Sequence, residues 1–206
     1  MQKYQSNINA ELGVIAPILA GGGYGGSLDM AGLQSVAIAV NAANQQIYGD
    51  GVQLDEINIV VNNTVTLTTA GESDLLLATV QGQTFADGEV ELRESDEPPF
   101  MGLTYLEQVR GANATNNTTM TGYRGVFYPR GKFAPPGKTT TSRTDNISPS
   151  ITQLVYTALA TDKGTLGASK LFTGSTAKAE AQAWCREKLA PATSYTPEII
   201  EEVDDQ

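Results

Sequence analysis

The sequence predicts a mainly β fold with one short helix after its early strands and a second helix near the C-terminus. Three observations predict it. Several runs between residues 33 and 161 are rich in Val, Ile and Thr and alternate apolar with small or polar residues, which is the period of a strand. Turn signatures such as YGDG at residues 48–51 separate these runs. A helical pattern is confined to two segments, so strands make up most of the predicted fold.

The chain divides into a predicted core and two arms. Residues 1–32 contain seven glycines and short apolar pieces, and we expect an extended or irregular glycine-rich N-terminal arm there. Residues 33–190 form the predicted β domain, and residues 191–206 form an acidic C-terminal arm. With 206 residues and 40% apolar content, the chain is long enough for one sizeable domain with arms.

The N-terminal arm contains a motif that could indicate a nucleotide site. Gly21, Gly23 and Gly26 match the G-x-G-x-x-G spacing of dinucleotide-binding loops. Such a site needs a helix that begins at the last glycine, because the N-terminal amides of that helix hold the pyrophosphate. Residues 33–48, which follow, instead alternate like a strand. We therefore interpret the glycines as a flexible linker.

A strand pair and a short helix open the predicted domain. Residues 36–42 and 57–69 are predicted as two strands around the YGDG turn. In the second strand Val65 and Leu67 alternate with threonines, which places a hydroxyl face opposite an apolar one. Residues 73–82 follow as a short helix, with Ser73 as the N-cap and Gly82 as the stop. Leu76 belongs to its leucine run and is a predicted core residue.

A hairpin, a further strand and a longer helix complete the predicted domain. Residues 100–109 and 123–136 read as a hairpin with a polar tip, and Phe133 is a predicted core residue on its second strand. Residues 148–161 read as another strand. Residues 176–190 are predicted as a helix whose apolar face includes Trp184 and Cys185. We expect Trp184 to anchor this helix on the sheet and Cys185 to be a small buried residue.

The composition argues against an enzyme. The chain has no histidine, so it lacks the Ser-His and Cys-His pairs, the histidine zinc ligands and the usual proton shuttle near neutral pH. One cysteine excludes an internal disulfide framework and suits a reducing cytoplasm. The acidic residues show neither glycosidase nor calcium-loop spacing. We expect no catalytic, cofactor or metal site.

The charge argues against a conventional nucleic-acid-binding module and against a membrane protein. With 23 acidic and 13 basic residues the net charge is −10, which repels phosphate backbones over most of the surface. The first residues do not have the pattern of a secretory signal, and no apolar run reaches membrane-spanning length. We expect a soluble chain that is not exported.

Two segments carry opposite charge. Residues 87–97 hold six acidic residues and one arginine, whereas residues 124–143 hold five basic residues and no acidic one. The acidic segment reads either as a solvated loop or as an electrostatic contact. We expect each segment to pair with the other, either within the fold or on a neighbouring copy.

Taken in order, these pieces resemble the major tail protein family of long, non-contractile tailed phages. Four stretches carry the resemblance: residues 36–51, 64–82, the hairpin of 98–109 with 123–136, and 170–189. The matching positions within them are Tyr48, Asp50, Leu75, Leu76, Leu77, Gly82, Gly102, Tyr123, Lys132, Phe133, Pro136, Phe172, Ala181 and Trp184. The long glycine-rich arm, the Asn/Thr tip at 111–121 and the acidic extension depart from the family pattern.

The resemblance implies a compact β-sandwich or barrel-like subunit with a flanking helix, which would be a structural protein of the virion assembled in the bacterial host cytoplasm. Six copies would close into a ring, and rings would stack into a tail tube through which double-stranded DNA passes without specific binding. Other tail proteins, namely the tape measure, tail tip and tail terminator, would be partners. An acidic lumen suits this role, because it repels the phosphates of a sliding duplex.

The same resemblance suggests which residues meet neighbours and which face DNA. Candidate contacts between subunits or rings are Tyr24, Tyr48, Asp50, Arg130 and Lys132. Candidate lumen acids are Glu89, Glu91 and Glu94, with the C-terminal acids as a second possibility.

Three other functions remain open on the sequence. The tube of a contractile tail or injection apparatus would have a similar ring fold. A β-sandwich surface-binding module, such as an adhesin, would be a stable monomer or small oligomer that binds glycan. A carboxylate enzyme would need a deep pocket with at least two converging acids of perturbed pKa.

Overall fold

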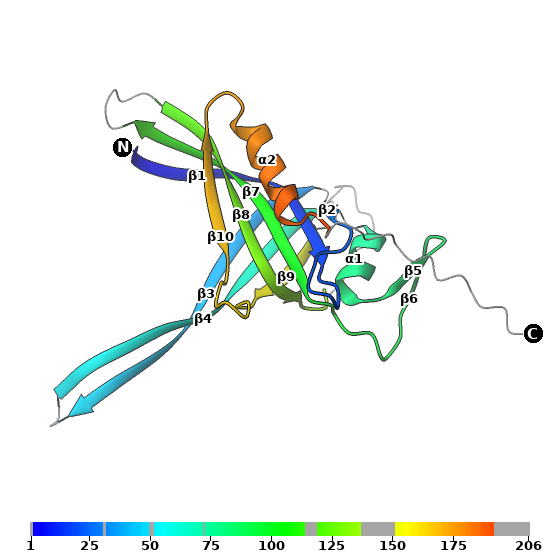
Figure 1. The fold of residues 1–206 in the computed structure, drawn as a ribbon, viewed down its shortest axis with the longest axis horizontal. Coiled ribbons are helices and arrows are strands. Elements are labelled where there is room, and N and C mark those ends of the chain that lie inside the picture. The colour runs from blue at the N-terminus through cyan, green and yellow to red at the C-terminus, as the bar shows by residue number, and fades with distance from the viewer. Residues whose placement is uncertain are drawn as a thin grey trace, which may run out of the picture.

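The computed structural model describes residues 2–30, 32–49, 52–71, 73–113, 119–136 and 151–191. As predicted, the fold is mainly β, with antiparallel sheets and two helices in these residues (Figure 1). The helices are α1 (Asp74–Gln81) and α2 (Ala177–Lys188). The strands are β1 (Gln2–Pro17), β2 (Leu28–Met30), β3 (Leu33–Gly49), β4 (Val52–Ala70), β5 (Thr84–Ala86), β6 (Glu89–Glu91), β7 (Met101–Asn113), β8 (Thr119–Phe133), β9 (Ile151–Ala158) and β10 (Ala168–Thr173).

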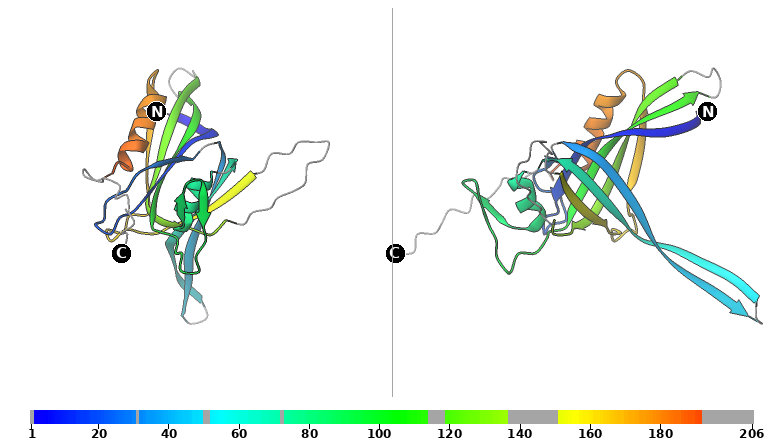
Figure 2. Two further views of the ribbon diagram at one scale, coloured as in Figure 1. Left: turned by 90° about the vertical axis from the view of Figure 1, so that its right-hand side faces the viewer. Right: turned by 180° about the vertical axis from the view of Figure 1, so that it is seen from behind.

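The predicted β7–β8 hairpin is confirmed and lies at the centre of the larger sheet. The strand order is β2-β1-β7-β8-β9-β4-β3, and β10 also pairs with β8. β8 pairs with β10 over residues 122–127 and with β9 over residues 131–133. Because the partner of β8 changes along its length, the sheet divides into two halves that share β7 and β8. The right-hand view of Figure 2 shows β3 and β4 crossing in front of the half that contains β1 and β10.

The main hydrophobic core lies between these halves and α1. Val65 and Leu67 on β4 are fully buried, which confirms the apolar face predicted from their alternation with threonines. The predicted core residues Leu76 and Phe133 are also buried and belong to this cluster. Phe133 packs against Tyr156 of β9, with ring centroids 5.0 Å apart. Burial of these large side chains supplies the main driving force for the fold.

The two predicted helices are confirmed, and each has an identifiable cause. α1 begins after Ser73 and ends at Gly82, whose φ of 72° is a left-handed conformation that glycine adopts without a Cβ penalty. α2 covers the opposite face of the sheet, where Ala177, Ala181 and Cys185 are buried at four-residue spacing. Trp184 anchors α2 as predicted, with its ring centroid 6.2 Å from that of Phe172 on β10.

The N-terminal segment differs from the prediction. Residues 2–17 are not an irregular arm before the core but strand β1, which pairs with β7 along nearly its whole length. The polar run of residues 2–11 concealed this, and register shifts interrupt the strand, one of them at Leu12, whose φ is 47°. Pairing with a long neighbouring strand therefore overrides the weak local pattern. The short strands β2, β5, β6 and β10 were also not predicted.

β3 and β4 form a hairpin that extends beyond the body of the fold. β4 pairs with β3 along the whole hairpin and with β9 only over residues 63–70. Between residue 63 and the tip of the hairpin, β3 is therefore the one described strand beside β4. Residues 40–49 and 52–62 therefore form a two-stranded ribbon, here called the arm, which projects away from the sheets (Figure 1). The YGDG turn predicted at its tip includes residues 50 and 51, which lie outside the described residues.

Candidate assembly surfaces

The arm exposes an apolar face far from the core. Of the thirteen exposed large apolar side chains in the described residues, nine lie on β3 and β4. Paired residues in a hairpin share a face, and successive residues alternate between faces. The pairs Ala43↔Ile59, Gln45↔Ile57 and Ile47↔Asp55 therefore lie on one face. We call Ile47, Ile57 and Ile59 the isoleucine face; their side chains are 40–60% exposed.

The opposite face of the arm is mainly polar and internally hydrogen-bonded, although Val60, which pairs with Ala42, and Tyr48 are exposed on it. Asn44 Nδ2 donates to Glu56 Oε1 at 2.6 Å, and Asn58 Nδ2 donates to the same oxygen at 3.2 Å. Tyr48 OH donates to Gln46 Oε1 at 2.5 Å. We call Asn44, Gln46, Glu56 and Asn58 the amide face. The side chains of the amide face are linked by hydrogen bonds among themselves and to Tyr48, whereas the isoleucine face has nothing to pack against within the described part of the chain.

The arm cannot derive its order from its own contacts alone. An isolated two-stranded hairpin is at best marginally stable in water. Both outer edges of the ribbon leave backbone N–H and C=O groups without a neighbouring strand in the described residues, and such edges readily pair with another chain. Exposed apolar side chains on the same ribbon point to burial against a partner.

A second projection lies at the other end of the molecule. The β5–β6 hairpin and α1 extend from the side opposite the arm (Figure 1). Leu75, Phe85 and Leu92 are exposed there, and Phe85 pairs across the hairpin with Val90. The described chain therefore carries two separate apolar surfaces that face different directions.

Among the predicted contact residues, Tyr48 lies near the tip of the arm and is 62% exposed. Asp50 lies outside the described residues. Tyr24 is half-buried within its own chain: its hydroxyl donates to the carbonyl oxygen of Pro129 at 2.8 Å, and its ring meets Phe127 edge-on. Burial raises the pKa of Tyr24. A contact of Tyr24 with a neighbouring copy stays a prediction.

Arg130 and Lys132 lie together on β8, beside Phe100. The guanidinium of Arg130 is 4.2 Å from the centre of the Phe100 ring, and Lys132 Nζ is 4.6 Å from it. Lys132 Nζ also donates to Glu97 Oε1 at 2.6 Å, and this bond lowers the pKa of Glu97. Arg130 lies 3.7 Å from Asp162. At Lys132 the predicted pairing of the basic and acidic segments occurs within one chain.

The candidate lumen acids lie on or beside the β5–β6 hairpin. Glu89 and Glu91 are exposed on β6, and Glu94 is exposed in the loop that follows. Glu91 pairs with Arg93 at 2.7 Å, which lowers the pKa of the glutamate. The orientation of these acids toward a lumen stays a prediction, because it depends on neighbouring copies.

Two hollows on the surface were considered as ligand sites. One, of about 430 Å³, lies between the glycine-rich turn at residues 18–24, Phe100 and Arg130. The other, of about 470 Å³, lies beneath the base of the arm and is lined by Asn63, Tyr105 and Arg124, among others. The second holds two buried polar atoms, Asn63 Oδ1 and the Tyr105 hydroxyl, and the side chain of Tyr128 interacts with both residues. Neither hollow has two converging acids with raised pKa values.

Metal and membrane sites were also considered. No group of three or more acidic or cysteine side chains in the described ranges could hold a metal ion. None of the helices in the described part of the chain is long and apolar enough to cross a membrane.

Sequence reasoning identified the tip of the arm but missed the isoleucine face. Ile47, Ile57 and Ile59 resemble ordinary strand residues in the sequence, and nothing local shows that no neighbouring strand covers them. The length of the two runs was the available signal, since β3 and β4 span 17 and 19 residues whereas typical strands have about five or six.

No protein-family model matches the chain, and no curated protein matches its sequence.

Proposed function

We propose that this protein is a structural virion protein whose copies form hexameric rings that stack into the tail tube of a long-tailed phage. The observation that carries the proposal is the arm, a two-stranded ribbon with an unburied isoleucine face. An ordered ribbon of this kind needs a partner, and a tube subunit would have neighbouring copies in its own ring and in the adjacent rings. The predicted β fold with two helices is consistent with the resemblance from which the proposal began.

The positions of the two projections support association of identical copies. The arm and the β5–β6 hairpin extend from opposite sides of the body (Figure 1). A contact in which different surfaces of two identical copies meet is head-to-tail, and repetition of such a contact gives a closed ring or a helical filament. A two-fold dimer would use one surface twice and would leave the other uncovered.

The net charge of the chain supports a tube through which DNA passes without being bound. The net charge of −10 disfavours a stable complex with a phosphate backbone. Glu89 and Glu94, exposed near the β5–β6 hairpin, form no ion pair among the described residues and are available to line a channel. A lumen lined in this way would let a duplex slide.

Electron microscopy of the purified protein tests the proposal. The wild-type chain at high concentration should form hollow filaments of uniform width. In the comparison variant residues 42–61 are replaced by Asn-Gly, which joins the directly paired Asn41 and Asn62 by a two-residue turn. This variant should keep the thermal unfolding of the core and form no filaments.

Two results would contradict the proposal. Wild-type protein that remains monomeric at every concentration and is absent from tail fractions of virions would exclude a tube subunit. Filaments of normal length from the variant without the arm would show that the arm is not what joins the copies.

A further inference from the structure

The charges of the chain are divided between its segments. Residues 33–97 contain eleven acidic residues and one basic residue, whereas residues 98–191 contain eleven basic and five acidic residues. The first segment includes the arm and the β5–β6 hairpin, and the second includes β7 to β10 and α2. A molecule with separated charge attracts a second copy in a head-to-tail orientation.

The arm contributes one exposed charge to its isoleucine face. Asp55 pairs with Ile47 across the hairpin, and it lies on the face that carries Ile57. Its Oδ1 accepts a bond from the backbone N–H of Glu56, and among the described residues it forms no ion pair. The neighbouring Glu56 points to the amide face and is already hydrogen-bonded there by Asn44 and Asn58. A partner that presents a cation opposite Asp55 would therefore complement the one charge on this face.

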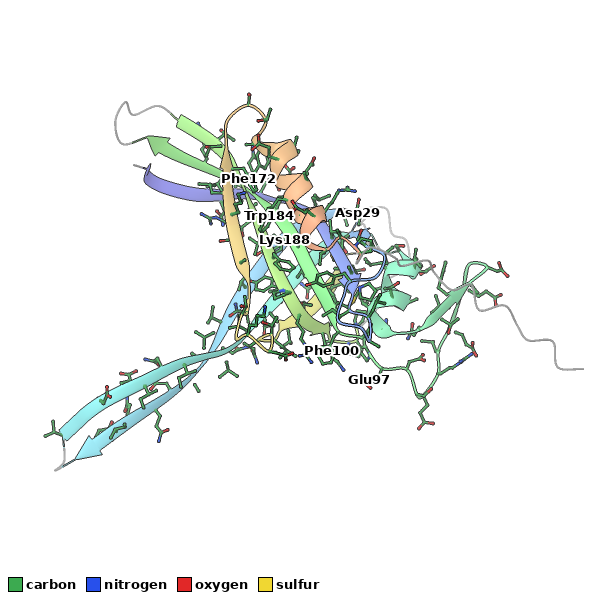
Figure 3. All side chains as sticks on the ribbon, in the orientation of Figure 1. Asp29, Glu97, Phe100, Phe172, Trp184 and Lys188 are labelled. Atoms are coloured by element: carbon green, nitrogen blue, oxygen red, sulfur yellow. The ribbon has the colours of Figure 1, made fainter. Side chains whose placement is uncertain are left out.

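Two exposed lysines lie on the same chain where β10 and α2 meet, beside the half-buried Trp184 and beside Phe172, which is only 8% exposed. Lys170 Nζ is 5.0 Å from the centre of the Phe172 ring, and Lys188 Nζ is 5.7 Å from the centre of the Trp184 ring. The two rings pack against each other, so both lysines border one aromatic pair; Figure 3 labels Phe172, Trp184 and Lys188. We call these four residues the lysine–aromatic patch.

The other basic side chains nearby are already paired. Lys178 lies 2.6 Å from Glu11, and Arg186 lies 2.8 Å from Asp29. Lys170 and Lys188 form no ion pair within the described ranges and are exposed. The outer edge of β10 also has no neighbouring strand there, because β10 pairs with β8 on its other side.

We propose, on the basis of the proposed self-assembly, that the isoleucine face of one copy docks on the lysine–aromatic patch of the next, with Asp55 paired to Lys170 and Lys188. The arm points away from its own α2 in all three views, so the contact joins two copies (Figures 1 and 2). The alternative apolar surface around Phe85 is less suitable, because residues 71–97 carry eight acidic residues and one basic residue and would repel an acidic arm.

Compensating charge reversal tests this docking. The variants are Asp55→Lys, the double variant Lys170→Asp with Lys188→Asp, and the combination of all three. Glu56→Lys is the matched control, since it makes the same charge change one residue away on the opposite face. The measurement is the concentration at which half of the protein sediments as polymer. All variants should retain wild-type thermal unfolding, because the exchanged side chains are exposed.

We expect Asp55→Lys and the lysine double variant each to raise that concentration at least about tenfold, which corresponds to about 1.4 kcal/mol per contact. The combined variant should return to within about threefold of wild type, and Glu56→Lys should remain within about threefold of it. A combined variant that assembles no better than its parents would overturn the docking, as would an effect of Glu56→Lys equal to that of Asp55→Lys. If the lysine reversal alone impairs assembly, the acidic residues of 192–206 are the better occupant and the proposal is wrong.

Disulfide cross-linking separates this inference from the proposed function. In a Cys185→Ala background, Asp55→Cys protein is mixed with Lys188→Cys protein and oxidised, with Glu56→Cys as the control for Asp55→Cys. A mixed dimer that forms with Asp55→Cys and not with Glu56→Cys supports the docking even if no tube forms. Wild-type polymer without this mixed dimer overturns the docking and leaves self-assembly standing. Absence of both polymer and mixed dimer overturns both.

Discussion

The indole of Trp184 packs directly over the backbone of Gly125. A Cβ at position 125 would lie 2.6 Å from Trp184 Cε3 and 2.8 Å from its Cζ3. Because Gly125 has no side chain, α2 can approach β8 closely at this point. This contact fixes the orientation of the lysine–aromatic patch.

Gly125→Ala should therefore destabilise the fold by about 1–3 kcal/mol, the usual cost of overpacking. Gly21→Ala is the matched control, because a Cβ there meets nothing within 4 Å and its φ is not in the left-handed range. Chemical denaturation with urea measures both. Equal midpoints for the two variants would show that α2 shifts without cost.

Replacement of Tyr24 by phenylalanine removes the hydroxyl that donates to Pro129. We expect Tyr24→Phe to lower the free energy of unfolding by about 1 kcal/mol, the net value of one such hydrogen bond. Tyr48→Phe should have no measurable effect on unfolding, because the Tyr48 hydroxyl lies on the exposed arm. Unchanged stability of Tyr24→Phe would favour the other prediction, in which Tyr24 serves a neighbouring copy.

A charge on the isoleucine face should block assembly and leave the subunit folded. Ile59→Lys places an ammonium group where the proposed interface is apolar, so we expect loss of filaments in electron micrographs. Its unfolding temperature should stay within about 2 °C of wild type, because Ile59 is 60% exposed and its loss from the subunit costs little. Asn58→Lys, on the amide face, is the control and should assemble. Filaments from Ile59→Lys would exclude this face from the interface.

Alkaline pH should destabilise the fold through Cys185. Burial raises the pKa of this thiol to about 11 from an ordinary value of 9.0. Because the folded-state pKa is the higher one, the stability that the neutral thiol contributes is full below pH 9 and is lost as the pH rises toward 11. The loss is about 1.4 kcal/mol for each unit between the two values. Urea denaturation at pH 7.5 and pH 10.5 measures it.

The Cys185→Ala variant is the control for that measurement. It should lose less stability between the two pH values, although the buried hydroxyls of Tyr105 and Tyr156, whose pKa values burial also raises, still contribute. The same fall in both proteins would assign the effect to the tyrosines alone. Alkylation of Cys185 by iodoacetamide at pH 8 should be slow until denaturant is added.

The ion pair of Lys132 and Glu97 gives a prediction at acid pH. The bond from Lys132 lowers the pKa of Glu97, so the interaction is present above pH 4.5 and is lost as the pH falls through the folded-state value. Nuclear magnetic resonance titration of the Glu97 carboxyl should show its pKa rising in Lys132→Ala. An unchanged titration curve would show that the pair does not persist in solution. The effect on overall stability should be small, because Glu97 is exposed.

The sequence determined the local structure wherever a short pattern has one physical solution. Ser73 and Gly82 delimit α1, the alternation of Val65 and Leu67 fixes the inward face of β4, and the four-residue spacing of Ala177, Ala181 and Cys185 fixes the face of α2. In each case the end signals of the element, or its periodicity over about ten residues, were sufficient to predict its type and its buried face.

Tertiary structure decided which surfaces are covered. β1 is a strand because β7 lies beside it, although its own residues 2–11 are polar and irregular. Ile57 and Ile59 are exposed because β9 ends before it reaches them, and the patch around Trp184 exists because β10 returns to β8. Burial depends on contacts between residues far apart in the chain, so no local pattern distinguishes an isoleucine in a core from one that is exposed on the arm.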